Sequence, residues 1–157
     1  MPRWLEHRIP PPVIDAACAV VMWLLAQAMP PAQLWPRGAW PAVVAALLLA
    51  GLGGMVALAG LLAFRSARTT MNPLAPRSAR VLVTAGIYRR TRNPMYLGML
   101  LVLAGWAVWL GNALAWFGLP LSIGLLTALQ IKPEERILAE RFGDDFRRYA
   151  ARTRRWI

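Results

Sequence analysis

The chain has 157 residues, of which 58% are hydrophobic and only 16% are charged, and its formal net charge is +11. The apolar residues stand in long blocks separated by arginine-rich segments, which excludes a soluble globular domain and is typical of membrane-spanning chains. Such a positive charge suits nucleic acid, anionic lipid or an anionic ligand. Because the arginines adjoin apolar blocks, we expect membrane lipids as partners and no nucleic acid.

The first apolar block covers residues 13–29 and carries one acid, Asp15, near its start. Three prolines at residues 10–12 precede it and favour a helix start. The block has no small-residue cleavage site, so we interpret it as a transmembrane helix and not as a secretory signal peptide. An acid inside a span is a functional candidate, which gives one alternative function, that of a small proton-coupled multidrug transporter.

The second block, residues 40–64, contains no charged residue. It exceeds the roughly 20 residues that a helix needs to cross the hydrocarbon core. Ala46, Ala50 and Gly54 repeat within it at one-turn spacing, with Gly51, Gly53 and Gly60 nearby, and such small residues let helices approach closely in lipid. We therefore expect these small residues to pack this helix closely against another span.

Two further uncharged blocks, residues 94–110 and 113–131, are separated only by Gly111 and Asn112, which are good turn formers. They predict a tight helical hairpin. Pro120 in the second block removes one backbone hydrogen bond and either kinks this helix or is tolerated, as proline often is in membrane helices. Because the two helices are nearly equal in length, the start of the first and the end of the second must lie side by side.

The tail, about residues 133–152, is predicted to form an amphipathic cytoplasmic helix with a cationic face. Its apolar residues recur at helical spacing, namely Leu138, Phe142, Phe146 and Tyr149. Gly143 followed by Asp144 predicts a break and a restart of the helix. Such a helix either lies on anionic lipid or covers a cytoplasmic pocket, and the two arrangements are compatible.

The basic residues predict the orientation. With four spans, seventeen of the eighteen Lys and Arg residues fall on one side and only Arg37 falls on the other. The positive-inside rule therefore places both termini and the central loop, about residues 65–93, in the cytoplasm. We predict an all-α fold class, a polytopic protein with one membrane domain over residues 1–157, located in a bacterial inner membrane.

The cytoplasmic ends of the hairpin carry the candidate chemistry. There, the segment from Asn93 to Tyr96 should meet Glu134 and Glu135 at the membrane surface. Local structure explains part of this composition, because Asn93 is a good N-cap, Pro94 suits the first helical position, and acids suit the first turn of a new helix. Capping does not require Tyr96 beside the caps, so a ligand site and a purely structural arrangement both remain open.

A resemblance favours the ligand site. The run L-V-T-A-G-I-Y-R-R-T-R-N-P-M-Y-L-G at residues 82–98 is followed, after one hairpin, by P-E-E-R and R-F-G-D-D-F-R-R-Y. This order resembles the isoprenylcysteine carboxyl methyltransferase family, in the wider group with phospholipid N-methyltransferases, over roughly residues 69–157. The resemblance implies a membrane enzyme that uses S-adenosylmethionine. It also implies a lipophilic acceptor entering from the bilayer: an isoprenoid-thioether carboxylate, a phospholipid or another small hydrophobic molecule.

The resemblance also implies site residues. Those at the cofactor are Arg80, Val81, Leu82, Val83, Tyr88, Asn93, Pro94, Met95, Tyr96 and Glu135. A carboxylate acceptor arrives ionised, whereas an amine must lose a proton, for which Glu134 or Glu135 is the available catalytic base. We assign Glu135 and Tyr88 to the cofactor and Glu134 to the acceptor. No metal is expected, because the sequence has no Cys or His cluster.

Two departures from the family pattern concern the acceptor and the mechanism. Family members commonly have histidine at the position of Asn93, which can hydrogen-bond but cannot titrate near neutral pH, so a histidine base is excluded there. Prenylcysteine enzymes have arginine a few residues before the paired glutamates, where this chain has Ile131 and Lys132.

Two alternative functions remain besides the transporter. One is a non-enzymatic membrane adaptor with an arginine-rich tail. The other is an NADPH-dependent reductase, for which no dinucleotide-binding signature is present.

Overall fold

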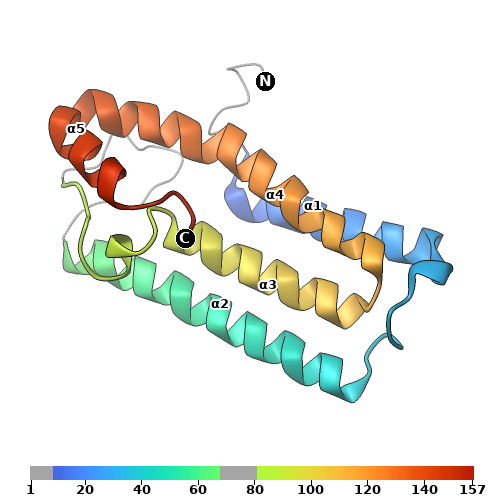
Figure 1. Ribbon diagram of the computed structural model, residues 1–157. Helices are drawn as coiled ribbons and strands as arrows, with labels where there is room; N and C mark the ends of the chain where they lie inside the picture. Colours follow the sequence, from blue (N-terminus) through green and yellow to red (C-terminus); the bar gives the residue numbers. More distant parts are fainter. Residues whose placement is uncertain (1–8, 68–80) are drawn as a thin grey trace.

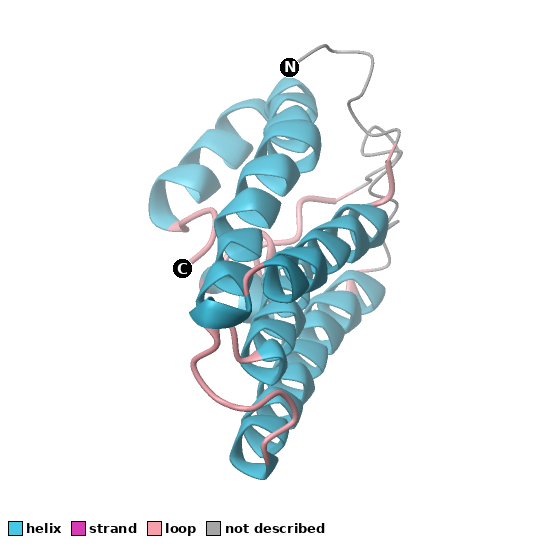
Figure 2. Ribbon diagram, turned by 90° about the vertical axis from the view of Figure 1, so that its right-hand side faces the viewer, coloured by secondary structure: helices cyan, strands magenta, loops and turns pink. Residues whose placement is uncertain are grey.

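The computed structural model describes residues 9–67 and 81–157. They form a bundle of helices (Figures 1 and 2). The elements are α1 (Pro11–Ala28), η2 (Pro30–Ala32), α2 (Trp40–Ser66), η4 (Gly86–Arg89), α3 (Pro94–Leu110), η5 (Ala113–Phe117), α4 (Gly118–Leu126), η6 (Thr127–Ile131) and α5 (Lys132–Arg152). Of these, η2, η4 and η5 are short 3₁₀ helices, and η6 is a π-helical turn.

The apolar helices have the lengths and surfaces of membrane spans. Among the described residues, three helical stretches are long and apolar enough to cross a membrane, namely Pro11–Ala28, Trp40–Ser66 and Ala113–Arg152, and Pro94–Leu110 is a shorter apolar helix. Large apolar side chains on α2 point outward, with Leu47 67% and Leu48 70% exposed, which suits contact with lipid. The predicted class, an all-α polytopic membrane protein with about four spans, is confirmed.

The core forms where α1 packs on α3, η5 and α4. The buried residues of α1 recur every fourth position, namely Ile14, Cys18, Met22 and Ala26. Gly118 permits the close approach of α4, because a Cβ at this position would lie 2.1 Å from Met22 Cγ. On the same interface, the Ser122 hydroxyl donates a hydrogen bond to Asp15 Oδ1. The acid that suggested a transporter therefore helps to join α1 to α4.

The contact between α2 and α3 has the close packing that the small residues of α2 predict, and it shows which of these residues make the contact. A Cβ at Gly53 would lie 2.5 Å from the Gly98 carbonyl oxygen, and a Cβ at Gly105 would lie 2.8 Å from the Ala46 oxygen. A Cβ at Gly54, by contrast, meets nothing within 4 Å. The packed residues of α2 follow a seven-residue spacing from Ala46 to Gly53, because two antiparallel helices that pack along their length keep a seam with a period near 3.5 residues.

The predicted hairpin turn is present between α3 and the fourth span. Gly111 ends α3 with a φ of 64°, a left-handed conformation that glycine adopts without a steric penalty. The Asn112 side chain accepts a hydrogen bond from the Leu114 backbone N–H and donates one to the Met29 carbonyl. Pro120 lies in the first turn of α4, directly after the 3₁₀ helix η5, and the first turn is where a helix accommodates proline most readily.

The fourth span and the C-terminal helix are continuous, which corrects the expectation that a new helix starts after Pro133. Ile131 is helical, with φ −66° and ψ −50°, and the wider π-helical turn η6 comes directly before the proline, which has no N–H to donate. The predicted break at Gly143 is confirmed by its φ of 52° and ψ of −123°. Beyond it, α5 folds back toward the start of α3 (Figure 1).

Candidate functional site

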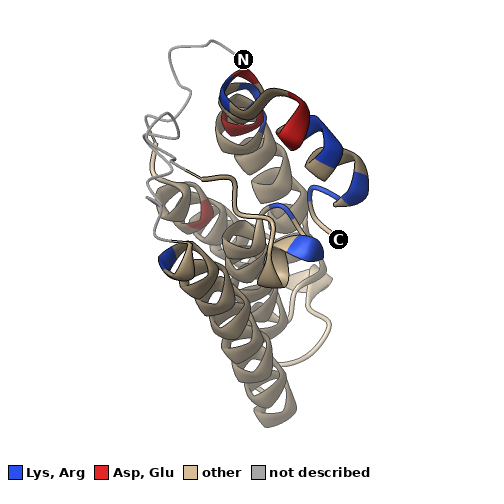
Figure 3. Ribbon diagram, turned by 90° about the vertical axis from the view of Figure 1, so that its left-hand side faces the viewer, with Lys and Arg blue, Asp and Glu red and all other residues tan. Residues whose placement is uncertain are grey.

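The candidate site lies at the charged end of the bundle. Lys and Arg residues gather on α5, on the loop before α3 and at the end of α2, and acids accompany them on α5 (Figure 3). The start of α3, the 3₁₀ helix η4 and the folded-back half of α5 meet at this end (Figure 1). Segments far apart in the sequence therefore bring their polar side chains together here.

A tyrosine and a glutamate join the two ends of the predicted hairpin. The Tyr96 hydroxyl, in the first turn of α3, donates a hydrogen bond of 2.6 Å to Glu134 Oε1 in the first turn of α5. Burial raises the pKa of the Glu134 carboxyl to about 7, against an opposing effect of the Tyr96 hydrogen bond and with a smaller contribution from the charge of Glu135. A carboxyl group with such a pKa can take up and release a proton near neutral pH.

The adjacent Glu135 has a different environment, because two arginines bind it. Arg92 Nη2 lies 2.7 Å from Glu135 Oε1, while Arg155 places Nη2 2.6 Å from Oε2 and Nε 3.0 Å from Oε1. Burial by itself raises the pKa of Glu135, but the hydrogen bonds and charges of Arg155 and Arg92 outweigh it, so that the pKa is lowered. Glu135 therefore stays ionised over the pH range in which Glu134 gains and loses its proton.

The segment before α3 holds the last residues of the chain. Arg92 donates through Nη1 to the carbonyls of Ala150 and Thr153, each at 2.8 Å. Asn93 was expected to cap α3, but its side chain makes no capping bond. Its Nδ2 donates instead to the Arg155 carbonyl at 2.9 Å. At the position of the family histidine, this chain thus has a residue that binds its own C-terminal backbone.

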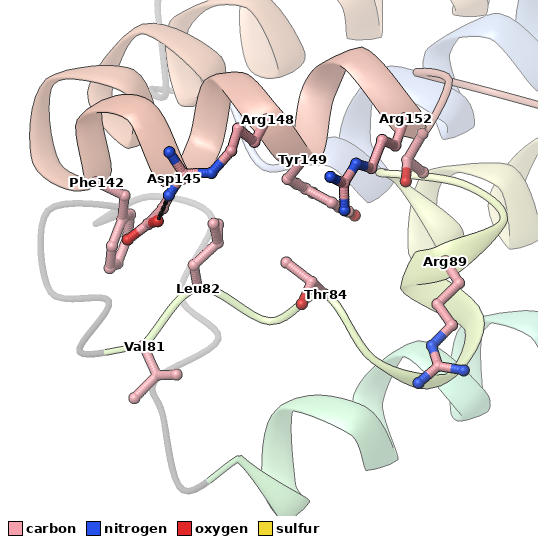
Figure 4. Close-up of a pocket in the computed structure, with 10 residues that line it drawn as sticks. Val81, Leu82, Thr84, Arg89, Phe142, Asp145, Arg148, Tyr149 and Arg152 are labelled. Carbon is pink, nitrogen blue, oxygen red and sulfur yellow. Dashed lines mark hydrogen bonds and ion pairs between the residues drawn. The ribbon is translucent and has the colours of Figure 1, made fainter.

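A cavity of about 720 Å³ lies between residues 81–89 and the folded-back half of α5 (Figure 4). It is lined by Val81, Leu82, Thr84, Arg89, Phe142, Asp145, Arg148, Tyr149, Arg152 and Thr153. One wall is fixed by Tyr149, whose hydroxyl donates to the Tyr88 carbonyl at 2.8 Å. Burial raises the pKa of Tyr149 to about 12, so this hydroxyl remains a donor at neutral pH.

The predicted cofactor residues fall into two groups. Val81 and Leu82 line the cavity, and Val83 and Tyr88 are buried beside it. The ring of Tyr88 packs edge-on against Phe64, at the end of α2, with ring centroids 5.4 Å apart. Burial, then the charges of Tyr149 and Glu134, raise the pKa of Tyr88. Arg80 lies outside the described residues.

The second group surrounds the start of α3. Pro94 and Tyr96 are buried, and both Pro94 and Met95 lie against Gly60 of α2, where a Cβ would come within 3.0 Å and 3.2 Å of them. Asn93 joins the C-terminal backbone, and Glu135 is held by its arginines. The start of α3 thus packs against α2 through Pro94 and Met95 and is joined to α5 by the Tyr96 to Glu134 hydrogen bond.

Sequence reasoning did not identify most of the α5 side of the cavity. The residues concerned are Phe142, Asp145, Arg148, Tyr149, Arg152 and Thr153. The signal was present, because most of them belong to the R-F-G-D-D-F-R-R-Y run or directly follow it. The amphipathic period of the tail does not indicate a cavity by itself, because only the sharp turn at Gly143 brings this second half of α5 over residues 81–89.

Fold and site together define an integral membrane protein with a cavity of mixed polar and apolar lining and a titrating carboxyl group at one end of a helical hairpin. Residues 41–145 match the family model described as phospholipid methyltransferase, so the chain belongs to that family and is a membrane methyltransferase. This confirms the resemblance. A Haemophilus influenzae protein described as uncharacterized is 48% identical over 63 residues, which make up 40% of this chain and 100% of that protein. No solved structure matches.

Proposed function

We propose that this protein transfers a methyl group from S-adenosylmethionine to the amine of a lipophilic acceptor. The methyl donor occupies the cavity between residues 81–89 and the second half of α5, and the acceptor amine approaches Glu134. The observation that carries the proposal is the Tyr96 to Glu134 hydrogen bond, which holds a carboxyl group with a pKa of about 7 at the end of the hairpin.

The cavity suits the methyl donor in size and chemistry. Its volume of about 720 Å³ falls among those of small-molecule sites, which run from about 300 to 1,000 Å³. Arg89 and Arg152 border it and supply donors for a carboxylate such as that of the methionine part, whereas Arg148 pairs with Asp145 of the same lining. Leu82 and Phe142 offer apolar surface to the adenine ring.

The surroundings of the two glutamates favour an amine acceptor over a carboxylate. Within the part of the chain that the structure describes, Arg92 and Arg155 bind Glu135 and not Glu134. Lys132, at the place of the family arginine, is exposed. A carboxylate acceptor beside Glu134 would meet a like charge, whereas an ammonium group would be attracted and hydrogen-bonded.

The roles of the residues follow from this placement. The bound cofactor supplies a methyl group already activated by its sulfonium sulfur. Glu134 takes the proton that the acceptor nitrogen must lose, and Tyr96 keeps the carboxylate oriented toward it. The buried side chains around Tyr88 and Tyr96 hold the reactants together and exclude water, and such positioning supplies most of the catalysis in a transfer of this kind.

We also propose that the site faces the cytoplasm of a bacterial cell, with the protein in the inner membrane and both termini cytoplasmic. The excess of Lys and Arg at this end of the bundle (Figure 3) supports this orientation. The acceptor then reaches Glu134 from the bilayer, since Tyr96 lies in the first turn of the membrane-spanning helix α3.

The alternatives have less support. The transporter hypothesis rested on Asp15, and this residue instead joins α1 to α4 by accepting a hydrogen bond from the Ser122 hydroxyl. An adaptor would need neither the cavity nor the Tyr96 to Glu134 pair. Family membership favours methyl transfer over a transporter, an adaptor and a reductase.

The cofactor site is tested by calorimetric titration of the detergent-purified protein with S-adenosylhomocysteine. We expect saturable binding that Arg152→Gln weakens, because Arg152 lines the cavity. Arg147→Gln is the matched control, since Arg147 is exposed on the same helix segment and pairs with Asp144. Absence of binding to folded protein, or equal binding by both variants, would contradict the cofactor placement.

A further inference from the structure

The last residues of the chain, 153–157, form a segment that lies against the loop before α3, and we name it the C-terminal strap. The Arg92 backbone N–H donates to the Arg154 carbonyl at 3.0 Å. The Thr91 hydroxyl donates to the Arg155 carbonyl at 3.3 Å, and Asn93 donates to the same carbonyl. Backbone and side chains of one short loop therefore fix the strap in place.

The carboxylate of Glu135 ties this strap to the first turn of α5. Glu135 accepts from Arg155 of the strap with both oxygens and from Arg92 of the loop with one. The three side chains are shielded, with 19%, 34% and 13% of the Glu135, Arg155 and Arg92 side chains exposed. Breaking the pairs would leave a charged group shielded from water without an opposite charge beside it, which is unfavourable. The three side chains therefore keep their paired geometry.

The strap also sets one wall of the cavity. Arg92 binds the Thr153 carbonyl at the end of α5, and Thr153 and Arg152 line the cavity. The folded-back half of α5 begins at Gly143, where a Cβ would meet no atom of the described residues within 4 Å. Attachments at the far end, through Arg92 and Tyr149, therefore determine where this wall stands.

We propose that Glu135 is a positioning residue: by binding Arg92 and Arg155 it fastens the C-terminal strap and the folded-back half of α5 over the methyl donor cavity. This inference rests on the proposed function. It differs from the role that the family resemblance implied, in which Glu135 contacts the cofactor. Both Glu135 oxygens are engaged by the chain's own arginines, so the residue acts through the wall that it holds.

The first test measures the strap itself. Spin labels are attached to cysteines placed at Arg65, at the end of α2, and at Ile157, which is exposed, in a Cys18→Ser background. Their distance distribution is recorded by pulsed electron paramagnetic resonance. We expect one narrow distribution that broadens in Glu135→Gln and in Arg155→Gln, and stays narrow in Arg147→Gln. Arg147 is the matched control, because it is an exposed arginine of α5 that pairs with Asp144.

The second test measures S-adenosylhomocysteine affinity in the same variants. We expect Glu135→Gln and Arg155→Gln each to weaken binding about ten-fold, and the double variant to weaken it no further, because coupled residues are not additive. Turnover at saturating cofactor should change less than the cofactor KM. If Glu135 contacts the cofactor instead, Glu135→Gln weakens binding with an unchanged distance distribution and Arg155→Gln has no effect. That pattern overturns the positioning role.

The two proposals fail in different ways. If the wild-type protein binds no S-adenosylhomocysteine, the proposed function is wrong, while a strap released by Glu135→Gln still supports the fastening role. If the distance distribution is the same in all variants, the fastening role is wrong whatever the cofactor binds. Should Glu135→Gln fail to fold, Arg155→Gln carries the same comparison, because it keeps the pair of Arg92 and Glu135.

Discussion

Replacement of Glu134 by glutamine removes the titrating carboxyl group while keeping its size. In the wild-type protein the pKa of about 7 means that about one-tenth of Glu134 is ionised at pH 6 and about nine-tenths at pH 8. If Glu134 accepts the acceptor's proton, the turnover rate rises about ten-fold between these pH values. Glu134→Gln should lose this rise and lower the rate at pH 8 by about 10²-fold to 10⁴-fold.

The sign of the stability effect separates catalysis from unfolding. The pKa of Glu134 is raised above its ordinary value of 4.5, so its contribution to folding is fully present below about pH 4.5 and is lost as the pH rises through about 7. Acid therefore does not destabilise the protein through this group. If the rate is lower at pH 6 than at pH 8 while the helicity is unchanged, the loss is due to protonation of Glu134 and not to unfolding.

The assay follows labelled methyl transfer at saturating cofactor and acceptor from pH 5.5 to 9, with circular dichroism at each pH. Glu140→Gln is the matched control, because Glu140 is exposed on the same helix, and it should keep the wild-type profile. A Glu134→Gln variant that retains both the rate and the pH-dependent rise would refute the assignment of Glu134 as the proton acceptor.

The remaining predictions concern the partner of Glu134 and the packing of α2. Tyr96→Phe removes a hydrogen bond that lowers the pKa of Glu134, so the rise in rate should move to higher pH; a rise at unchanged pH would contradict the role of Tyr96. Gly53→Ala should lower the melting temperature in detergent, because its Cβ would lie 2.5 Å from the Gly98 carbonyl oxygen and overpacking costs about 1–3 kcal/mol. Gly54→Ala, which meets nothing within 4 Å, should not destabilise the fold; equal losses in both variants would show that α2 and α3 do not pack as described.

Much of the fold could be predicted from the sequence, because lipid requires each span to be a long apolar helix with its backbone hydrogen bonds satisfied internally. The hairpin at Gly111, the break at Gly143 and the meeting of Tyr96 with Glu134 all follow from local residue types and from span lengths. The packing face of α2 could not be chosen in this way. Its small residues occupy several faces, and only the partner helix selects one of them.

The site could be predicted less completely, because it depends on contacts between distant segments. The pairing of Glu135 with Arg155 requires the chain to reverse at Gly143 and pass back over the start of α3. An arginine-rich tail offers several equivalent partners for one glutamate, and the sequence does not rank them. The cavity between residues 81–89 and α5 has the same origin, since its two walls come from segments more than one hairpin apart.

The most direct test of the central claim is methyl transfer by the purified protein in vesicles, with labelled S-adenosylmethionine and two acceptors offered separately. One is a phospholipid with a primary amine in its headgroup, and the other is a lipophilic thioether carboxylate. We predict labelled amine lipid, no labelled carboxylate, and loss of the product in Glu134→Gln. Labelling of the carboxylate alone, or no transfer to either acceptor by folded protein that binds the cofactor, would contradict the amine methyltransferase assignment.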